Sequence, residues 1–141
     1  MWPRTFSDRL QAWAVLREQC TTAELPVALT AIDTWWQQTP WCPYHLHWDD
    51  RPTWPDPWQL LDDNLYCSLA RGLGIMYTIA MLDRKDTQDA VLFEAEGDNL
   101  VQVASGKYIL NWSGGTLLNI NPGTKNLRRR ISQQEILQQI Q

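Results

Sequence analysis

Cys67 is the residue of this chain best placed by type and context to act as a nucleophile. Cysteine enzymes often carry their thiol near the start of a helix that leads into a sheet. Cys67 stands in such a context: a helix-start signal precedes it, and an apolar run that contains two glycines follows it. A reactive thiol also needs a base and a group that orients the base. The two histidines, His45 and His47, both precede Cys67, and none follows it. We therefore interpret Cys67 first as a structural residue.

A second group of reactive side chains lies in the segment "CPYHLHWDD", which contains Cys42, His45, His47, Asp49 and Asp50. In an extended chain the two histidines project to the same side, and imidazole with thiolate suits zinc. However, the segment lacks the paired spacing of structural zinc ligands, and the cysteines outside it are expected on helices. We predict no metal site and no cofactor, and interpret the segment as polar residues within an aromatic connector.

A predicted helix over 57–72 carries Cys67. Asp56 is its expected N-cap, and a proline occupies the first helical position. Gly72 and Gly74 are expected to end it. This places Cys67 at least two turns into the helix, beyond the first turn, where the helix dipole most favours a thiolate.

Strand patterns follow this helix. The run 75–82 is rich in β-favouring residues and predicts a central, buried strand. Segments 90–96 and 99–105, joined by Gly-Asp, predict a hairpin. Segment 107–112 predicts another strand, and 116–120 a further short one.

Two helices are predicted before the sheet. An apolar stripe indicates a helix over 6–19, capped by Thr5 or Ser7. A second helix is expected over 23–38, with Thr22 as its cap. The short connection between them predicts an antiparallel hairpin.

The resulting prediction is a single α+β domain. It comprises an N-terminal helical hairpin (1–38), a Trp- and Pro-rich connector (39–57), a central helix packed on an antiparallel sheet of about four or five strands (58–120), and a short C-terminal helix (131–141). Ser132 and Glu135 stand at capping-box spacing at the start of that last helix.

Composition excludes several classes of function. The net charge of −4 and the pI of about 5.0 argue against a nucleic-acid binder. No apolar run approaches the roughly 20 residues of a membrane span, and the charged N-terminal residues are unlike a signal peptide. Three cysteines form no paired disulfide framework, which favours a reducing compartment.

Tryptophan is strongly enriched, with nine residues in 141. Trp41, Trp48 and Trp54 crowd into the proline-rich connector, and Trp is common at protein interfaces. We predict that these three rings bind a partner protein, with Arg128, Arg129 and Arg130 as a second contact. The alternative is that the rings pack the joints of a small domain.

The segment "YCSLARGLGI", followed by a meander of strands, resembles the core of the transglutaminase-like and papain-like cysteine folds over about residues 56–112. Cys67 matches the cysteine of that pattern. The histidine position falls near Asp89 or Ala90, and neither is a histidine. The third position matches Asn99 or Asn111. The resemblance therefore implies a relative that lacks its catalytic base.

A broader resemblance concerns origin. "WPDPWQLLDDNLYCSLARGLGIMYTI" with "GKYILNW" is similar to short proteins of T4-like, contractile-tailed phages, notably those of cyanobacteria. It implies a virion or assembly protein, made in the host cytoplasm, that contacts other phage virion proteins in the tail, baseplate or neck and binds neither nucleic acid nor membrane.

These observations lead to one expected function and two alternatives. The expected function is a non-enzymatic structural protein that assembles with partner proteins. The first alternative is a cysteine-dependent acyl-transfer enzyme, of the transglutaminase, amidase or protease type, with Cys67 as nucleophile; a rearranged triad would then use His45 or His47. The second is a peptide- or glycan-binding module that uses exposed Trp residues.

Overall fold

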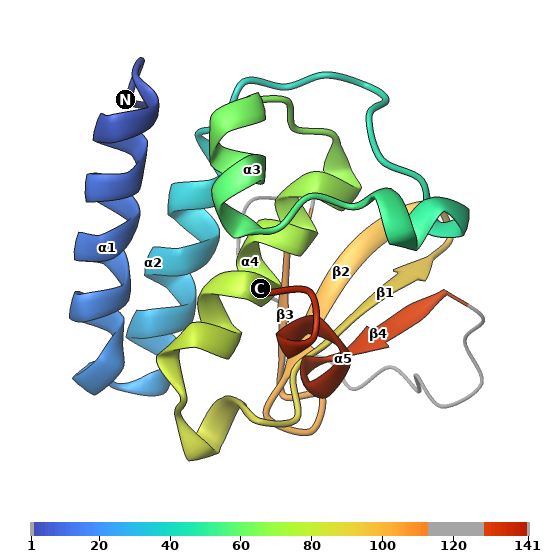
Figure 1. Cartoon of the computed structure of the whole chain (residues 1–141). Helices are drawn as coiled ribbons and strands as arrows, with labels where there is room; N and C mark the ends of the chain where they lie inside the picture. The colour runs from blue at the N-terminus through green and yellow to red at the C-terminus, as the bar shows by residue number, and fades with distance from the viewer. Residues whose placement is uncertain (1, 113–128, 141) are drawn as a thin grey trace.

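Helices come first along the chain, then a sheet, then one more helix (Figure 1). This computed structural model describes residues 2–112 and 129–140. The helices are α1 (Phe6–Thr22), α2 (Leu25–Gln37), α3 (Pro57–Asp63), α4 (Ser68–Leu82) and α5 (Gln133–Leu137), with short 3-10 helices η1 (Trp48–Thr53) and η2 (Lys85–Thr87). The strands are β1 (Val91–Ala95), β2 (Asp98–Val103), β3 (Tyr108–Leu110) and β4 (Arg130–Ser132). The predicted α+β class is confirmed.

The sheet is antiparallel, in the order β3-β2-β1-β4. Its β1–β2 hairpin is the predicted one, and it turns through Glu96 and Gly97, whose φ angles are 52° and 86°. Strand β4 was not predicted, because three residues are too few to show alternation; its pairing with β1 defines it. The predicted strand at 116–120 lies outside the described residues.

The first two helices form the expected antiparallel hairpin (Figure 1). Thr5 caps α1, since its side chain accepts a hydrogen bond from the backbone N–H of Asp8. The predicted cap of the second helix, Thr22, is wrong because α1 continues through it. Helix α2 instead begins after Glu24 and carries its proline in the first turn, where a missing N–H does no harm.

The predicted long helix over 57–72 is wrong, because it is two helices. Asp56 caps the start as expected, with its side chain accepting from the N–H of Gln59. Helix α3 then ends at Asn64, which takes a left-handed conformation with φ 56°. After a short extended segment, a new helix, α4, begins behind Cys67.

The predicted strand over 75–82 is also wrong, because this run is the second half of α4. Almost every residue of α4 is buried, so its sequence shows no polar face that would reveal a helical period. Gly72 and Gly74 do not end a helix. They allow close packing, because a Cβ at these positions would lie 2.7 Å from Leu92 and 2.5 Å from Trp36, respectively.

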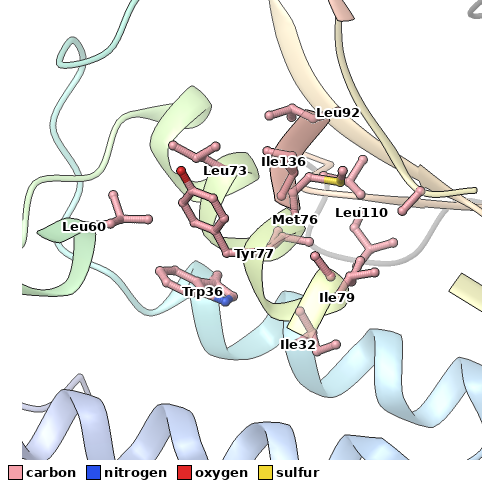
Figure 2. Packing of buried hydrophobic residues seen from close by; sticks show 14 of the residues in the cluster. Ile32, Trp36, Leu60, Leu73, Met76, Tyr77, Ile79, Leu92, Leu110 and Ile136 are labelled. Carbon is pink, nitrogen blue, oxygen red and sulfur yellow. The ribbon is translucent and has the colours of Figure 1, made fainter. Parts of the chain in front are cut away.

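Helix α4 is the centre of the fold and lies between the N-terminal helices and the sheet (Figure 1). Figure 2 shows Tyr77 of α4 beside Trp36 of α2, and Met76 on the opposite side, toward Leu110 of β3. Leu92 of β1 also faces this core, whereas its neighbours along β1 belong to a second cluster on the other face of the sheet.

Tryptophan enrichment serves mainly the core. Trp13 and Trp36 are fully buried, and Trp2, Trp35, Trp36 and Tyr66 form an aromatic cluster with ring centroids 4.6–6.2 Å apart. Across the two described ranges, no helix combines the length and apolar character needed to cross a membrane.

Candidate functional site

The break between α3 and α4 moves Cys67 to the N-cap of the central helix. Its backbone is extended there, with φ −84° and ψ 178°. Its Sγ accepts a hydrogen bond from the backbone N–H of Leu46 at 3.4 Å, and the residue is 4% exposed. The predicted mid-helix position is therefore wrong. The actual position is one where the helix dipole favours a negative charge.

Two asparagines from the sheet meet the start of α4 beside Cys67. Asn99, near the start of β2, donates to the side chain of Ser68 at 3.3 Å. Asn111, just after β3, donates to the backbone oxygens of Ser68 at 2.9 Å and Asn99 at 2.7 Å. The Asn99 side-chain oxygen accepts from the indole N–H of Trp48 at 2.7 Å. Each amide is therefore committed to a structural hydrogen bond.

The arrangement has the chain order of a cysteine triad without its base. The cysteine at the helix start is followed by two asparagines, one in β2 and one just after β3, and both hydrogen-bond to its neighbour Ser68. Asp89, near which the histidine of the family pattern would fall, does not supply the base either, because its carboxylate accepts from the N–H groups of Ala104 and Ser105 at the other end of β2. The residues that do meet the helix start are Asn99 and Asn111, and a neutral amide cannot take a proton from a thiol.

His47 is the histidine that shares a pocket with Cys67. Both line a hollow of about 420 Å³ between the connector, the start of α4 and the β1–β2 turn. The His47 ring packs against Tyr44, edge to face, with centroids 4.4 Å apart. His45 does not line this pocket. A rearranged catalytic arrangement would thus use His47.

Two aromatic rings stand exposed at this pocket. Trp41 is 57% exposed and Tyr44 is 73% exposed, and both line it. The Trp41 ring is held from one side by the guanidinium of Arg71, 4.9 Å from the ring centroid. Arg71 is itself fixed by two hydrogen bonds to Thr39, at 2.7 and 2.8 Å. The aromatic surface is therefore ordered before any partner arrives.

A second hollow of about 380 Å³ adjoins the first and shares Trp41, Ser68 and Gly97 with it. Arg71 and Asp98 belong to its lining. Trp41 therefore separates two adjacent depressions, which together we call the α4 groove.

The rim of the α4 groove is charged. Arg129 forms ion pairs with Glu94 at 3.0 Å and Asp49 at 3.7 Å. The three side chains are partly or largely exposed, between 30% and 75%, so solvent screens each pair and it stabilises the fold by no more than about 1 kcal/mol. Arg130 lies in β4 and its backbone oxygen accepts from Arg51. Arg128 lies outside the described residues.

Trp48 and Trp54 are not exposed anchors, contrary to the prediction. They are 8% and 6% exposed, and their rings meet edge to face at 5.4 Å. The Trp54 indole donates to the backbone oxygen of His47 at 2.7 Å. The connector turns through η1 and folds these rings inward, which its composition alone did not indicate. Tyr44, which was not predicted as a site residue, is the more exposed ring.

The reactive residues of segment 42–50 do not converge. Within residues 2–112 and 129–140, no three His, Cys, Asp or Glu side chains lie close enough together to hold a metal ion.

Asp33 is a buried carboxylate that holds the backbone of Asn111 in place, and its burial leads to a pH-dependent prediction. It is 4% exposed, and its carboxylate accepts from the N–H of Asn111 at 3.0 Å and from Gln37 at 3.3 Å. Burial raises the pKa of Asp33, and these two hydrogen bonds only partly oppose the shift. The charged form is therefore disfavoured in the folded protein.

Because the pKa of Asp33 is higher in the folded than in the unfolded chain, its contribution to stability is complete below the unfolded pKa and is lost as pH rises through the folded pKa. Asp33→Asn keeps an acceptor oxygen without the charge. We expect the stability of wild type relative to Asp33→Asn to fall as the pH rises above about 4, the ordinary pKa of an aspartate in the unfolded chain. Urea unfolding of both proteins across this range checks it, and a difference that is constant with pH would contradict it.

Comparison of the chain with protein-family models, with curated proteins and with solved structures finds no match.

Proposed function

We propose that this protein is a non-enzymatic assembly protein that acts through protein–protein contacts at the α4 groove. The observation that carries the proposal is the pair of exposed rings, Trp41 and Tyr44, at the edge of a concave surface. Large aromatic side chains that enter or border a pocket commonly supply most of the binding energy of an interface. The ion pairs around Arg129 would form the polar rim that such interfaces have.

The Trp41 ring is held in place in the free protein, which favours its use as a binding surface. Prolines at 40 and 43 flank Trp41, and Arg71 holds its ring. Restricting the free surface in this way lowers the entropy lost on binding. Asn99, beside the start of α4, is a neutral amide that is hydrogen-bonded to Ser68 and Trp48 and supplies no base, which favours binding over catalysis.

The partner is proposed to be another virion protein of a tailed phage, in the tail, baseplate or neck. The support for this context is the similarity of the α3–α4 and β3 segments to short proteins of T4-like phages. The corresponding experiment is to purify particles of the phage that carries the gene and probe them for this chain. Absence of the chain from both finished particles and assembly intermediates would refute the virion assignment.

Trp41→Ala is expected to weaken partner binding by at least ~2 kcal/mol, which is about thirtyfold in Kd. The ring is exposed, so fold stability should change much less. The partner is first identified by cross-linking in infected cells and then titrated calorimetrically with the purified variants. Trp58→Ala is the matched control, because Trp58 is also exposed, at 37%, but lies on α3 and lines neither hollow of the groove.

Equal losses of affinity for Trp41→Ala and Trp58→Ala would place the interface elsewhere. Trp48→Ala and Trp54→Ala are expected to destabilise the fold instead, because these rings are buried. Their affinity effects therefore cannot be used to map the surface.

A second candidate function is cysteine-dependent acyl transfer. The observation in its favour is that Cys67 caps α4 and opens into the same pocket as His47. In that reaction the thiolate attacks a carbonyl carbon and expels an amine, and water or a second amine then resolves the thioester. His47 would remove the thiol proton and return it to the leaving amine.

Labelling kinetics separate the two functions. We expect iodoacetamide to label Cys67 slowly in the folded protein at neutral pH, because the residue is 4% exposed. Cys42 is less buried and serves as the internal comparison. Rapid, stoichiometric labelling of Cys67 that is lost in His47→Ala would favour the enzyme instead.

A further inference from the structure

The cysteines at 42 and 67 stand in register across a short backbone pairing. Trp41 and Tyr66 form a parallel β-bridge, and the N–H of Cys42 donates to the backbone oxygen of Tyr66 at 3.0 Å. The residues that follow the bridged pair, one on each segment, are Cys42 and Cys67. The hydrogen bond therefore joins the backbone of Cys42 to the residue directly before Cys67.

This pairing limits the distance between the two Cα atoms. The Cα of Cys42 is joined to its own N–H, the hydrogen bond leads to the Tyr66 oxygen, and the Tyr66 peptide group leads to the Cα of Cys67. With standard bond lengths, these steps keep the two Cα atoms at most about 7 Å apart. A disulfide needs Cα atoms roughly 4.4–6.8 Å apart. The backbone pairing therefore holds the two Cα atoms no farther apart than about the upper limit of that range. Both are free thiols in this structure.

A cation and a backbone N–H donor lie beside the pair. Cys67 receives the N–H of Leu46 on its Sγ and sits at the positive end of α4. The Arg71 guanidinium lies close enough to both sulfurs for their charges to raise its pKa, although burial lowers it more.

We propose that Cys42 and Cys67 form a redox-active dithiol that closes to an intramolecular disulfide when exposed to a small-molecule disulfide such as oxidised glutathione. The less buried Cys42 thiolate attacks one glutathione sulfur and expels glutathione thiolate. The Cys67 thiolate then attacks the Cys42 sulfur of this mixed disulfide and expels the second glutathione. Two protein thiols are oxidised, one disulfide is reduced, and the two thiol protons end on the two glutathiones.

The cross-link would join the start of the connector to the start of α4, directly beside Trp41. It would close a loop that contains η1 and α3, and would remove freedom from the unfolded chain. A reducing cytoplasm keeps such a pair open, and an oxidising exterior closes it.

The test uses the full-length protein, reduced and then incubated with oxidised glutathione without denaturant. Intact mass spectrometry should show the loss of two hydrogen atoms per chain. A peptide map made under non-reducing conditions should join the peptides of Cys42 and Cys67. The thermal midpoint should rise on oxidation and return when dithiothreitol is added.

Cys20→Ser is the matched control, because Cys20 is buried at the far end of α1, where its thiol donates to the oxygen of Ala28. This variant should oxidise like wild type, whereas Cys42→Ser and Cys67→Ser should not close. The wild-type peptide map identifies the pair even where a variant folds poorly. A glutathione adduct on Cys42 alone, a cross-link that includes Cys20, or no reaction would each overturn the proposal.

Discussion

Thr78→Val is expected to lower the free energy of unfolding by roughly 2–6 kcal/mol, because it leaves two buried indole N–H groups without an acceptor. The Thr78 hydroxyl is fully buried and accepts from Trp13 and Trp36, each at 2.9 Å. It donates in turn to the backbone oxygen of Gly74 at 2.8 Å. The Thr78 hydroxyl of α4 thus accepts hydrogen bonds from one indole on α1 and one on α2, and it links the three helices.

Valine has nearly the shape of threonine, so the substitution tests the hydrogen bonds rather than the packing. Thr78→Ser is the complementary control, since it keeps the hydroxyl and removes one methyl group, at a cost of about 1 kcal/mol. Urea unfolding, followed by tryptophan fluorescence and circular dichroism, measures both. If valine costs no more than serine, the three helices are not joined through this hydroxyl.

Gly74→Ala is expected to destabilise the protein by about 1–3 kcal/mol or more, through overpacking. A Cβ at this position would lie 2.5–2.6 Å from three atoms of the Trp36 ring. Trp36 is 1% exposed and its indole is bonded to Thr78, so the ring cannot move away freely. In an open helix the same change would stabilise by up to about 1 kcal/mol, so the sign of the effect is diagnostic.

Gly72→Ala provides the comparison two residues earlier on α4. Its Cβ would meet the tip of Leu92 at 2.7 Å, which is the flexible end of an aliphatic side chain. We expect a smaller loss than at Gly74, because Leu92 can rotate while a fixed indole cannot. Equal melting temperatures for wild type and Gly74→Ala would show that Trp36 has room to shift.

Local signals in the sequence predicted the ends of several elements correctly. Thr5, Asp56 and Ser132 each cap a helix, and the last forms the expected capping box with Glu135. The predicted β1–β2 hairpin also forms, with its turn at Glu96 and Gly97, one residue earlier than predicted. These features depend on hydrogen bonds and backbone angles within a few residues of each other, so the sequence carries them directly.

The candidate site was predicted only in part. Cys67 and Asn99 were named in advance, but the site was placed in mid-helix, because one helix was predicted where the structure has α3 and α4. Asn64 ends α3 by taking a left-handed conformation, which Asn adopts more readily than most residues but does not require. That single turn decides whether Cys67 caps a helix or lies inside one.

The sequence by itself determined the α+β class, the order of helices before strands, and the capped helix starts, because these follow from local chemistry and composition. Only the tertiary structure decided that the run behind Cys67 is a buried helix, since burial on all sides removes the periodic pattern. It also decided that Trp48 turns inward while Trp41 stays exposed, and that Asn99 meets the start of α4. Those outcomes depend on contacts between residues far apart in the chain, such as the Trp48–Asn99 hydrogen bond, and no local pattern encodes them.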